Sequence, residues 1–223
     1  MLVCTPPDRH RIDIDRALDA EAPVLVERPL ASRLVDADAI VARGARVLLG
    51  ENLAHSPIIT AVRRHLATIG AIGFIEVRLL SPRPTWGSYL ERERGGGVLF
   101  DLGSSALALA LLLAGEFPMS IEATVTASDD LDVDDRAEVR LSFPSGANAR
   151  VEVNWRSSAA MWDVQVSSET DVVRAELLPI PAIEHNGDPV PLPARRFDVD
   201  PHVELLGHVA QLEALQRVVD GEA

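Results

Sequence analysis

The sequence is short of positive charge and of aromatic side chains. It contains 21 Lys and Arg residues against 34 Asp and Glu, which gives a formal net charge of −13, and aromatics make up 4% of its 223 residues. Proteins that bind nucleic acid cluster Lys and Arg in order to neutralise phosphates. The arginines here are scattered among acids, so nucleic acid is excluded as an expected partner.

Cysteine and metal-binding patterns are also scarce. Cys4 is the one cysteine, so no disulfide can form within the chain, and its apolar neighbours predict a buried thiol. None of the six histidines lies three or four residues from another, and no H-E-x-x-H motif occurs. The acidic stretch over residues 128–135 lacks EF-hand spacing and predicts a solvated loop. We therefore expect no metal site.

No segment predicts a membrane span or a secretory signal. The longest apolar run, residues 106–114, is far shorter than the ~20 residues needed to cross a bilayer. The first residues, MLVCTPPDRH, show no basic region followed by an apolar core. These patterns predict a cytoplasmic protein with no membrane partner.

The sequence does have a hydrophobic content of 47%, arranged in two successive patterns. Residues 1–50 alternate short apolar strands with helices, in the order strand–helix–strand–helix–strand. That order predicts a parallel sheet with helices packed on it. The third of these strands is expected to begin at Ala45.

Residues 51–223 follow the second pattern. A helix is expected over residues 56–70 and a strand over 72–80, followed by the glycine-rich stretch RGGGVLFDLGSS and an apolar helix. Five strands with alternating apolar and polar residues come next and predict an antiparallel sheet with one packed face. Residues 180–201 are expected to be irregular, and residues 202–221 to form a closing amphipathic helix.

Several segments together resemble one known family. VCTPPDRH, VLVERPLA, GENLAHSP, IGAIGFIEVR and GGGVLFDLGSSALALALLLAG occur in the order and spacing of the Gfo/Idh/MocA oxidoreductases. The resemblance implies NAD(P)-dependent chemistry on sugars, cyclitols or related compounds. It also implies an α/β plus α+β fold. A partial Rossmann-like β-α-β remnant is expected over residues 1–50. A C-terminal domain with a large, mostly antiparallel open sheet flanked by helices is expected over residues 51–223.

The catalytic positions implied by the resemblance are altered in this chain. Arg28 stands where the family has the lysine of Glu-Lys-Pro, and arginine stays charged at any working pH. Asp101 and Ser105 fall on the family's Asp-x-x-x-His pair, so a hydroxyl replaces the histidine. Asp101, Arg28 and Ser105 are therefore the candidate catalytic residues. On the residues alone, Asp101 is equally explained as a helix N-cap or first-turn acid.

The resemblance also implies a set of cofactor-binding positions. Thr5, Pro6, Glu27, Pro29 and Asn52 match residues near the family's nicotinamide, and each is equally explained as a strand-end or turn residue. The chain carries no G-x-G-x-x-G turn to hold a pyrophosphate, and ERGGGV lacks the strand-to-helix context of that motif. NAD or NADP is expected if any cofactor is used, with none bound by this chain alone, and the choice between the two stays open.

These residues are compatible with two functions. The first is a cofactor-free relative that serves as a binding or oligomerisation module, or as a non-redox catalyst, for a sugar-like small molecule. The alternative is an NAD(P)-dependent oxidoreductase whose cofactor half-site comes from a missed upstream start or a partner chain.

The antiparallel sheet is also expected to mediate self-association. Trp86, Trp155 and Trp162 are expected in packing or at an interface, with aromatics on one face of that sheet. In the family this sheet commonly mediates contacts between subunits. The resemblance therefore implies a homodimer or a higher homo-oligomer.

Overall fold

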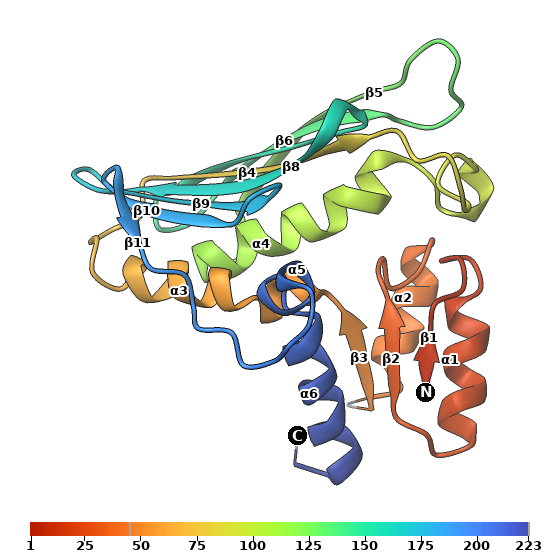
Figure 1. Cartoon of the computed structure of the whole chain (residues 1–223). Coiled ribbons are helices and arrows are strands. Elements are labelled where there is room, and N and C mark those ends of the chain that lie inside the picture. The colour runs from red at the N-terminus through yellow and green to blue at the C-terminus, as the bar shows by residue number, and fades with distance from the viewer. Residues whose placement is uncertain (45, 223) are drawn as a thin grey trace.

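The computed structural model describes residues 1–44 and 46–222, and these residues form two sheets (Figure 1). The smaller sheet contains β1 (Leu2–Val3), β2 (Val24–Glu27) and β3 (Val47–Gly50), which pair in parallel and in that order. Helices α1 (His10–Asp19) and α2 (Leu34–Val41) connect them. The predicted β-α-β-α-β order is confirmed, although Ala45 lies outside the described residues.

The small sheet has its own apolar core. Val3, Val24 and Val26 pack with Ile14 of α1 and Ile40 of α2, and all five side chains are buried. Because the strands are parallel, their carboxyl ends lie at one edge of the sheet. Figure 1 shows that the ends of β1 and β2 point toward the segment that precedes α4 (Ser104–Ala114). Polar residues that follow these strands are therefore brought toward the second part of the chain.

The larger sheet has eight strands in the order β11-β10-β9-β8-β4-β7-β6-β5. Within the described residues, β4 and β7 form its one parallel pair and the other neighbours are antiparallel. This confirms the predicted open and mostly antiparallel sheet. Its strands are β4 (Phe74–Pro82), β5 (Ser120–Thr126), β6 (Arg136–Ser142), β7 (Asn148–Asn154), β8 (Arg156–Ser167), β9 (Val172–Leu178), β10 (Ala182–His185) and β11 (Asp188–Val190).

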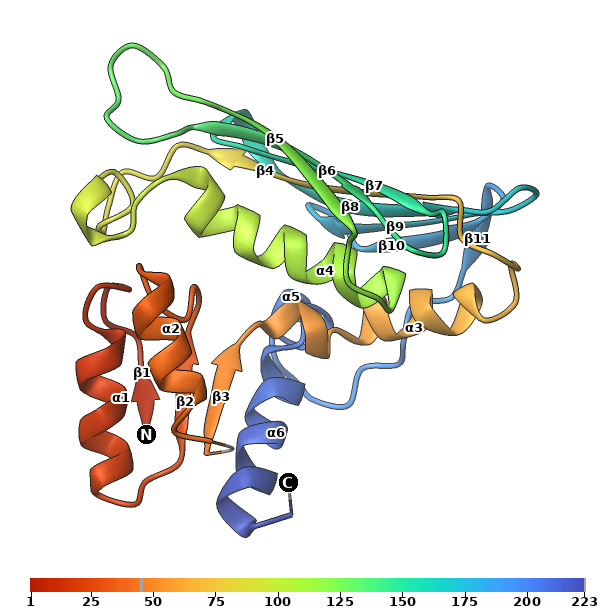
Figure 2. The same ribbon diagram turned by 180° about the vertical axis from the view of Figure 1, so that it is seen from behind.

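Two helices cover one face of the large sheet (Figure 2). Helix α3 (Pro57–Leu66) packs on β9, and α4 packs on β4 and β7. The helical run Arg92–Ala114, which ends with α4, is long and apolar enough to cross a membrane by length and composition. Half of that window is buried inside the protein, so its hydropathy matches its place beneath the sheet.

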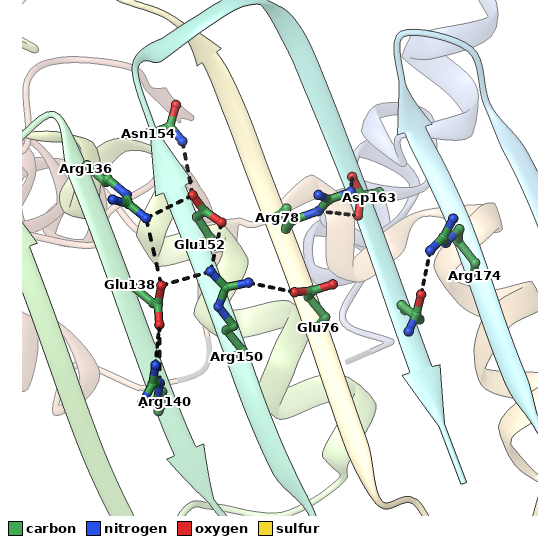
Figure 3. A network of polar contacts seen from close by, with 11 residues as sticks. Glu76, Arg78, Arg136, Glu138, Arg140, Arg150, Glu152, Asn154, Asp163 and Arg174 are labelled. Carbon is green, nitrogen blue, oxygen red and sulfur yellow. Dashed lines mark hydrogen bonds and ion pairs between the residues drawn. The ribbon is translucent and has the colours of Figure 1, made fainter.

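The sheet's two faces differ in chemistry because strand residues alternate. In β4, Val77 and Leu79 are fully buried against the helices, whereas Glu76 and Arg78 lie on the outer face. Figure 3 shows a lattice of arginines and carboxylates across that outer face. Arg150, for example, reaches Glu76 at 3.0 Å. The outer face is thus charged.

Of the two roles expected for Trp155 and Trp162, packing is confirmed. Trp155 is 3% exposed and belongs to the core. Trp162 is opposite Leu79 and Leu178 in neighbouring strands, and it packs against the same core. The strand register therefore turns both rings toward the helices.

The C-terminal quarter departs from two predictions. Residues 180–201 were expected to be irregular, but β10 and β11 form a hairpin there. His185 is opposite Asp188, and the two residues between them, Asn186 and Gly187, both have positive φ. That geometry is typical of a type I′ hairpin turn, which Asn-Gly favours.

The closing helix is interrupted rather than continuous. It forms as α5 (Pro201–Leu205) and α6 (His208–Asp220), separated at Gly207. Gly207 has φ +94°, and a Cβ there would overlap the backbone oxygen of Asn52. The close approach of the 3₁₀ turn at Asn52–His55 therefore breaks the helix.

Candidate functional site

A pocket with a volume of about 200 Å³ opens between the small sheet and the segment before α4. Six of the eight predicted site residues line it: Thr5, Pro6, Glu27, Arg28, Pro29 and Asp101. The other lining residues are Cys4, Pro7, Trp86, Gly87, Ser88, Tyr89, Gly95 and Phe100. Tertiary structure thus brings one group of predicted residues to a single site.

Asp101 lies in a π-helical turn, Leu99–Gly103, just before α4. Its Oδ2 accepts a hydrogen bond from Trp155 Nε1 at 3.1 Å. Its Oδ1 lies 3.9 Å from Arg28 Nη1, and Arg28 also donates to the backbone oxygen of Asp101. The carboxyl therefore faces Arg28 and Trp155, both distant in sequence.

Asp101 is not a helix cap. No side chain caps the π turn from its N-cap position, and the N–H of Leu99 is bound by Asp134 Oδ2 at 2.8 Å. Asp134 lies in the acidic loop that precedes β6. Its carboxylate accepts the hydrogen bond from the first N–H of the π turn, which is the role that the N-cap interpretation gave to Asp101. The N-cap interpretation of Asp101 is therefore wrong, whereas the alternative of a first-turn acid is confirmed, because Asp101 lies in the first turn of the π helix.

The environment of Asp101 favours its protonated form. Burial raises the pKa of the carboxyl, while the positive charge of Arg28 and the hydrogen bond from Trp155 act in the opposite direction. The net result is a pKa above the ordinary value for Asp. A carboxyl of this kind is better suited to exchange a proton near neutral pH than an exposed one.

Arg28 is held between carboxylates on neighbouring elements. Its Nε lies 3.9 Å from Glu27 Oε1, and its side chain is 15% exposed. Among the described residues, Nε has no hydrogen-bond partner, although it is buried. Because a guanidinium stays protonated, Arg28 supplies a fixed positive charge and an N–H donor but no exchangeable proton.

Ser105 does not reach the pocket. Its side chain is 1% exposed, and its hydroxyl donates to Glu51 Oε2 at 2.7 Å. Burial raises the pKa of Glu51, while the bond from Ser105 and the charge of Arg28 lower it. The hydroxyl of Ser105, at the family's histidine position, is therefore hydrogen-bonded to the buried carboxyl of Glu51 and not to a group in the pocket.

Glu51 was missed by sequence reasoning. It directly follows β3 and is 7% exposed, which is rare for a glutamate. The sequence signal that could have found Glu51 is its position, because it is an acidic residue immediately after a short apolar strand. Its Oε1 has no partner among the described residues, so Glu51 and Arg28 each bring an unpaired polar atom to the region behind the pocket.

Asn52 also lies outside the pocket. Its Nδ2 donates to the backbone oxygen of Leu206 at 2.9 Å, and it is 8% exposed. Ser56 makes the matching contact, its hydroxyl donating to the backbone oxygen of Leu205 at 2.6 Å. Both side chains therefore attach the C-terminal segment to the 3₁₀ turn.

A buried imidazole joins the two strand-end loops of the pocket. His10 is fully buried, with Nε2 2.6 Å from the backbone oxygen of Thr5 and Nδ1 3.0 Å from that of Pro29. The Thr5 hydroxyl is directed away, toward Asp13 at 2.9 Å. Thr5 and Pro29 therefore shape the pocket wall mainly through their backbone.

An aromatic wall faces the charged residues. Trp86 and Tyr89 meet edge to face, with ring centroids 5.3 Å apart and an interplanar angle of 89°. Trp86 is 72% exposed. Burial raises the pKa of the Tyr89 hydroxyl, and the charge of Asp101 adds to the effect. The sequence predicted packing or an interface for Trp86, whereas the structure places it at the pocket.

The three glycines at residues 95–97 shape this wall. A Cβ at Gly96 would overlap the backbone oxygen of Tyr89, and a Cβ at Gly97, whose φ is +113°, would overlap Asp134 Oδ1. Glycine is thus needed so that the Tyr89 loop and Asp134 can both approach the start of the helical run.

The prediction of a buried Cys4 thiol is wrong. Cys4 is exposed, and it lines the pocket. The strand β1 ends at Val3 and lies at the edge of its sheet, so nothing in the described residues covers the next side chain fully. The described residues also contain no group of three His, Cys, Asp or Glu side chains able to hold a metal ion.

The family model of the GFO/IDH/MocA C-terminal domain matches residues 60–172, half of the chain. Together with the small parallel sheet and the open eight-stranded sheet, this match defines an oxidoreductase-type fold. The chain belongs to the Gfo/Idh/MocA family.

Curated relatives resemble this chain over part of their length. It is 26% identical over 194 residues to inositol 2-dehydrogenase of Rhizobium meliloti (strain 1021), covering 79% of this chain and 56% of that one. It is 39% identical over 120 residues to dTDP-3,4-didehydro-2,6-dideoxy-alpha-D-glucose 3-reductase of Streptomyces violaceoruber, covering 49% and 34%. The chain thus spans about half or less of these relatives.

Solved structures share the whole fold. GenD2 from gentamicin A biosynthesis, in complex with NAD, has a TM-score of 0.84 at 22% identity, covering 100% of this chain and 69% of that one. Aldose-aldose oxidoreductase from Caulobacter crescentus, complexed with glycerol, has a TM-score of 0.82 at 24% identity, covering 99% and 69%. At these identities the likeness shows the fold.

Proposed function

We propose that this chain is a cofactor-free relative of the sugar and cyclitol dehydrogenases, which binds a small polyol-like molecule in the Asp101 pocket. One observation carries the proposal. Asp101 and Arg28 share the pocket, whereas Ser105, at the family's histidine position, is buried against Glu51. Residues 1–50 would then supply one pocket wall, and residues 51–223 would supply the acid and the surface for self-association.

The pocket favours acid–base chemistry without hydride transfer. The carboxyl of Asp101, whose pKa is raised by burial, exchanges a proton with a hydroxyl or with a carbon next to a carbonyl. Arg28 stabilises negative charge that develops on the neighbouring oxygen. Trp86 offers an apolar ring face to the C–H side of a polyol. An isomerase or a lyase is the reaction class that uses these groups.

The residues present fit one end of a nicotinamide dinucleotide and not the other. Thr5, Pro6, Glu27 and Pro29 line the pocket at the positions expected beside a nicotinamide. A pyrophosphate requires backbone N–H groups at a strand-to-helix turn. In the described part of the chain, the turns after β1 and β2 contain Pro6, Pro7 and Pro29, and proline has no N–H. These turns therefore do not form a phosphate cradle.

The alternative is an NAD(P)-dependent oxidoreductase whose phosphate-binding half comes from elsewhere. The open edge of the small sheet favours it. Strand β1 has a neighbour on one side only, and Met1 and Leu2 are 51% and 57% exposed. A further strand supplied by an upstream segment or a partner chain would pair with that edge. The intact Thr5 and Pro6 wall would then face the completed cofactor site.

Ligand titration of the purified chain separates the two functions. The probes are myo-inositol, D-glucose, NADH and NADPH, followed by isothermal calorimetry and by fluorescence, since Trp86 and Trp155 lie at the site. We expect saturable polyol binding and no saturable binding of either dinucleotide. Micromolar binding of NADH or NADPH by the chain alone would overturn the cofactor-free proposal. Asp101→Asn is expected to weaken polyol binding, and Ser105→Ala to leave it unchanged as the matched control.

A further inference from the structure

Arg28 carries a largely buried positive charge that no carboxylate binds. Its side chain is 15% exposed, the lowest value among the arginines that lie within ion-pair distance of an acid. Arg150 and Arg78 are 33% and 37% exposed, and each has a carboxylate oxygen at 3.0 Å or less. The carboxylate oxygens nearest to Arg28 belong to Glu27 and Asp101, and both lie 3.9 Å away, beyond hydrogen-bond range. Because a desolvated charge is costly unless it is paired, Arg28 lacks a bonded counter-ion within the described residues.

The two neighbouring carboxylates are engaged with other groups. Glu27 Oε1 accepts a hydrogen bond from the backbone N–H of Arg28 at 3.1 Å, and its side chain is 53% exposed, so water and salt screen its charge. Asp101 Oδ2 accepts a hydrogen bond from Trp155, and burial raises the pKa of this carboxyl. Neither carboxylate therefore gives Arg28 a close and fully charged partner.

The nitrogen of Arg28 that is free to bind a ligand is Nη2. Nη1 donates to the backbone oxygen of Asp101, and Nε is buried. Nη2 makes no hydrogen bond among the described residues and is not one of the buried unpartnered atoms, so it keeps contact with solvent at a residue that lines the pocket. A guanidinium presents its N–H groups in a planar fork that matches the two oxygens of a carboxylate. The pocket therefore has a binding group for an anion with this shape.

The rest of the pocket fits a small hydroxylated molecule. Its volume of about 200 Å³ is less than the roughly 300–1,000 Å³ of pockets that take drug-sized ligands. Trp86 presents an exposed ring on one wall. Tyr89 lies beside it, and because burial raises the pKa of its hydroxyl, that group stays protonated as a hydrogen-bond donor. These features suit a single sugar unit.

We propose that the pocket binds a sugar acid, either an aldonate or a uronate, with its carboxylate on the guanidinium of Arg28. The inference rests on the proposed function, because it names the class of polyol that the same pocket takes. The ligand's carboxylate supplies the counter-ion that Arg28 lacks, and its neighbouring hydroxyls lie beside Asp101. The lysine that the family has at this position would offer a compact point charge and not a planar fork.

A phosphate group fits this site less well than a carboxylate. Phosphates are bound by several backbone N–H groups at once, as at a helix N-terminus or in a nest of successive amides. The turns beside Arg28 contain Pro6, Pro7 and Pro29, which have no N–H to donate. Glu27 would also repel a doubly charged anion. One guanidinium matches the single charge and the two oxygens of a carboxylate.

A matched pair of ligands tests the preference for a carboxylate. D-gluconate and D-sorbitol share one carbon chain and differ at one end, where a carboxylate replaces a hydroxymethyl group. Isothermal calorimetry of the full chain at constant ionic strength should give a dissociation constant at least about tenfold lower for gluconate than for sorbitol. The net charge of −13 opposes this preference, so non-specific attraction does not produce it. Equal affinities, or tighter binding of D-sorbitol 6-phosphate than of gluconate, would overturn the inference.

Substitutions of Arg28 test whether the guanidinium causes the preference. Arg28→Gln should bring the ratio of the sorbitol and gluconate dissociation constants to within about threefold of one, and Arg28→Lys, which keeps the charge without the fork, should retain part of the wild-type ratio. Arg33→Gln, at an arginine that is 73% exposed and does not line the pocket, is the matched control and should keep the wild-type ratio. Circular dichroism melting verifies that each variant is folded. A wild-type ratio in either Arg28 variant would overturn the assignment to the guanidinium fork.

Failure of the inference differs from failure of the proposed function. If the wild-type chain binds sorbitol and gluconate equally well, the pocket takes polyols without a preference for acids, and the proposed function stands. If it binds neither ligand, the proposed function fails together with the inference. Both outcomes are measured on the wild-type chain and do not depend on how any variant folds.

Discussion

Replacing Asp101 with Asn tests whether this carboxyl takes part in ligand binding in the pocket or only stabilises the start of a helix. Asn keeps the size of the side chain and an oxygen that can accept the bond from Trp155, but it removes the charge that lies 3.9 Å from Arg28. In a medium of effective dielectric constant near 20, an ion pair at that separation attracts by about 4 kcal/mol. Burial of the carboxylate opposes this attraction, and because the pKa of Asp101 is raised, burial outweighs it.

The sign of the pH dependence follows from that direction. A carboxyl whose folded pKa is raised makes the folded chain lose stability as pH rises from the ordinary Asp pKa through the raised one. Asn does not titrate, so the variant escapes this loss. We expect the unfolding free energy of Asp101→Asn, relative to wild type, to rise between about pH 3 and about pH 8.

A capping carboxylate would give the opposite result. Helix N–H groups stabilise the charged form, lower the pKa and add stability as pH rises. Asp134→Ala is therefore the reference, because Asp134 binds the N–H of Leu99 at 2.8 Å. Loss of such a contact costs about 0.5–2 kcal/mol. We expect this cost with polyol affinity unchanged.

Urea unfolding followed by tryptophan fluorescence measures both variants across the pH range. Polyol titration is run on the same samples. The reasoning about Asp101 is refuted if Asp101→Asn loses stability relative to wild type as pH rises while its polyol affinity stays that of the wild type.

Three further substitutions test the surroundings of the pocket. Gly97→Ala should destabilise the fold by about 1–3 kcal/mol, because φ is +113° and a Cβ would overlap Asp134. Gly146→Ala is the control: its Cβ would meet open space, so the substitution should cost about 1–2 kcal/mol from the positive φ alone. Urea unfolding measures both variants. Ser105→Ala should cost about 1–3 kcal/mol in the same assay, since it leaves Glu51 with one donor fewer. Asn52→Ala should speed hydrogen exchange in α6 without changing polyol affinity, because it removes the contact to Leu206.

The sequence located Asp101 and Ser105 but did not predict that their side chains lie in different surroundings. A spacing of four residues places two side chains on one face of a regular α-helix. Here Asp101 lies in a π turn and faces Trp155, while Ser105 lies in the first turn of the regular helix α4 and faces Glu51. The motif located both residues, but the local change of helix type separates their surroundings.

The sequence by itself determined the two sheets. The strand–helix alternation of residues 1–50 and the period-two patterns after residue 120 predict them, because burial on one face imposes those periods along the chain. The sequence also contains Asn186-Gly187, a dipeptide that favours a hairpin turn. The prolines on both sides of it suggested an irregular segment instead.

Only the tertiary structure decided which candidate residues meet. Trp155 reaches Asp101 across 54 positions, and Leu206 reaches Asn52 across 154. No local pattern encodes such contacts, because they depend on how the two sheets and the C-terminal segment pack. Burial, and with it the raised pKa of Asp101 and the desolvated charge of Arg28, is likewise a property of that packing and not of any single stretch of sequence.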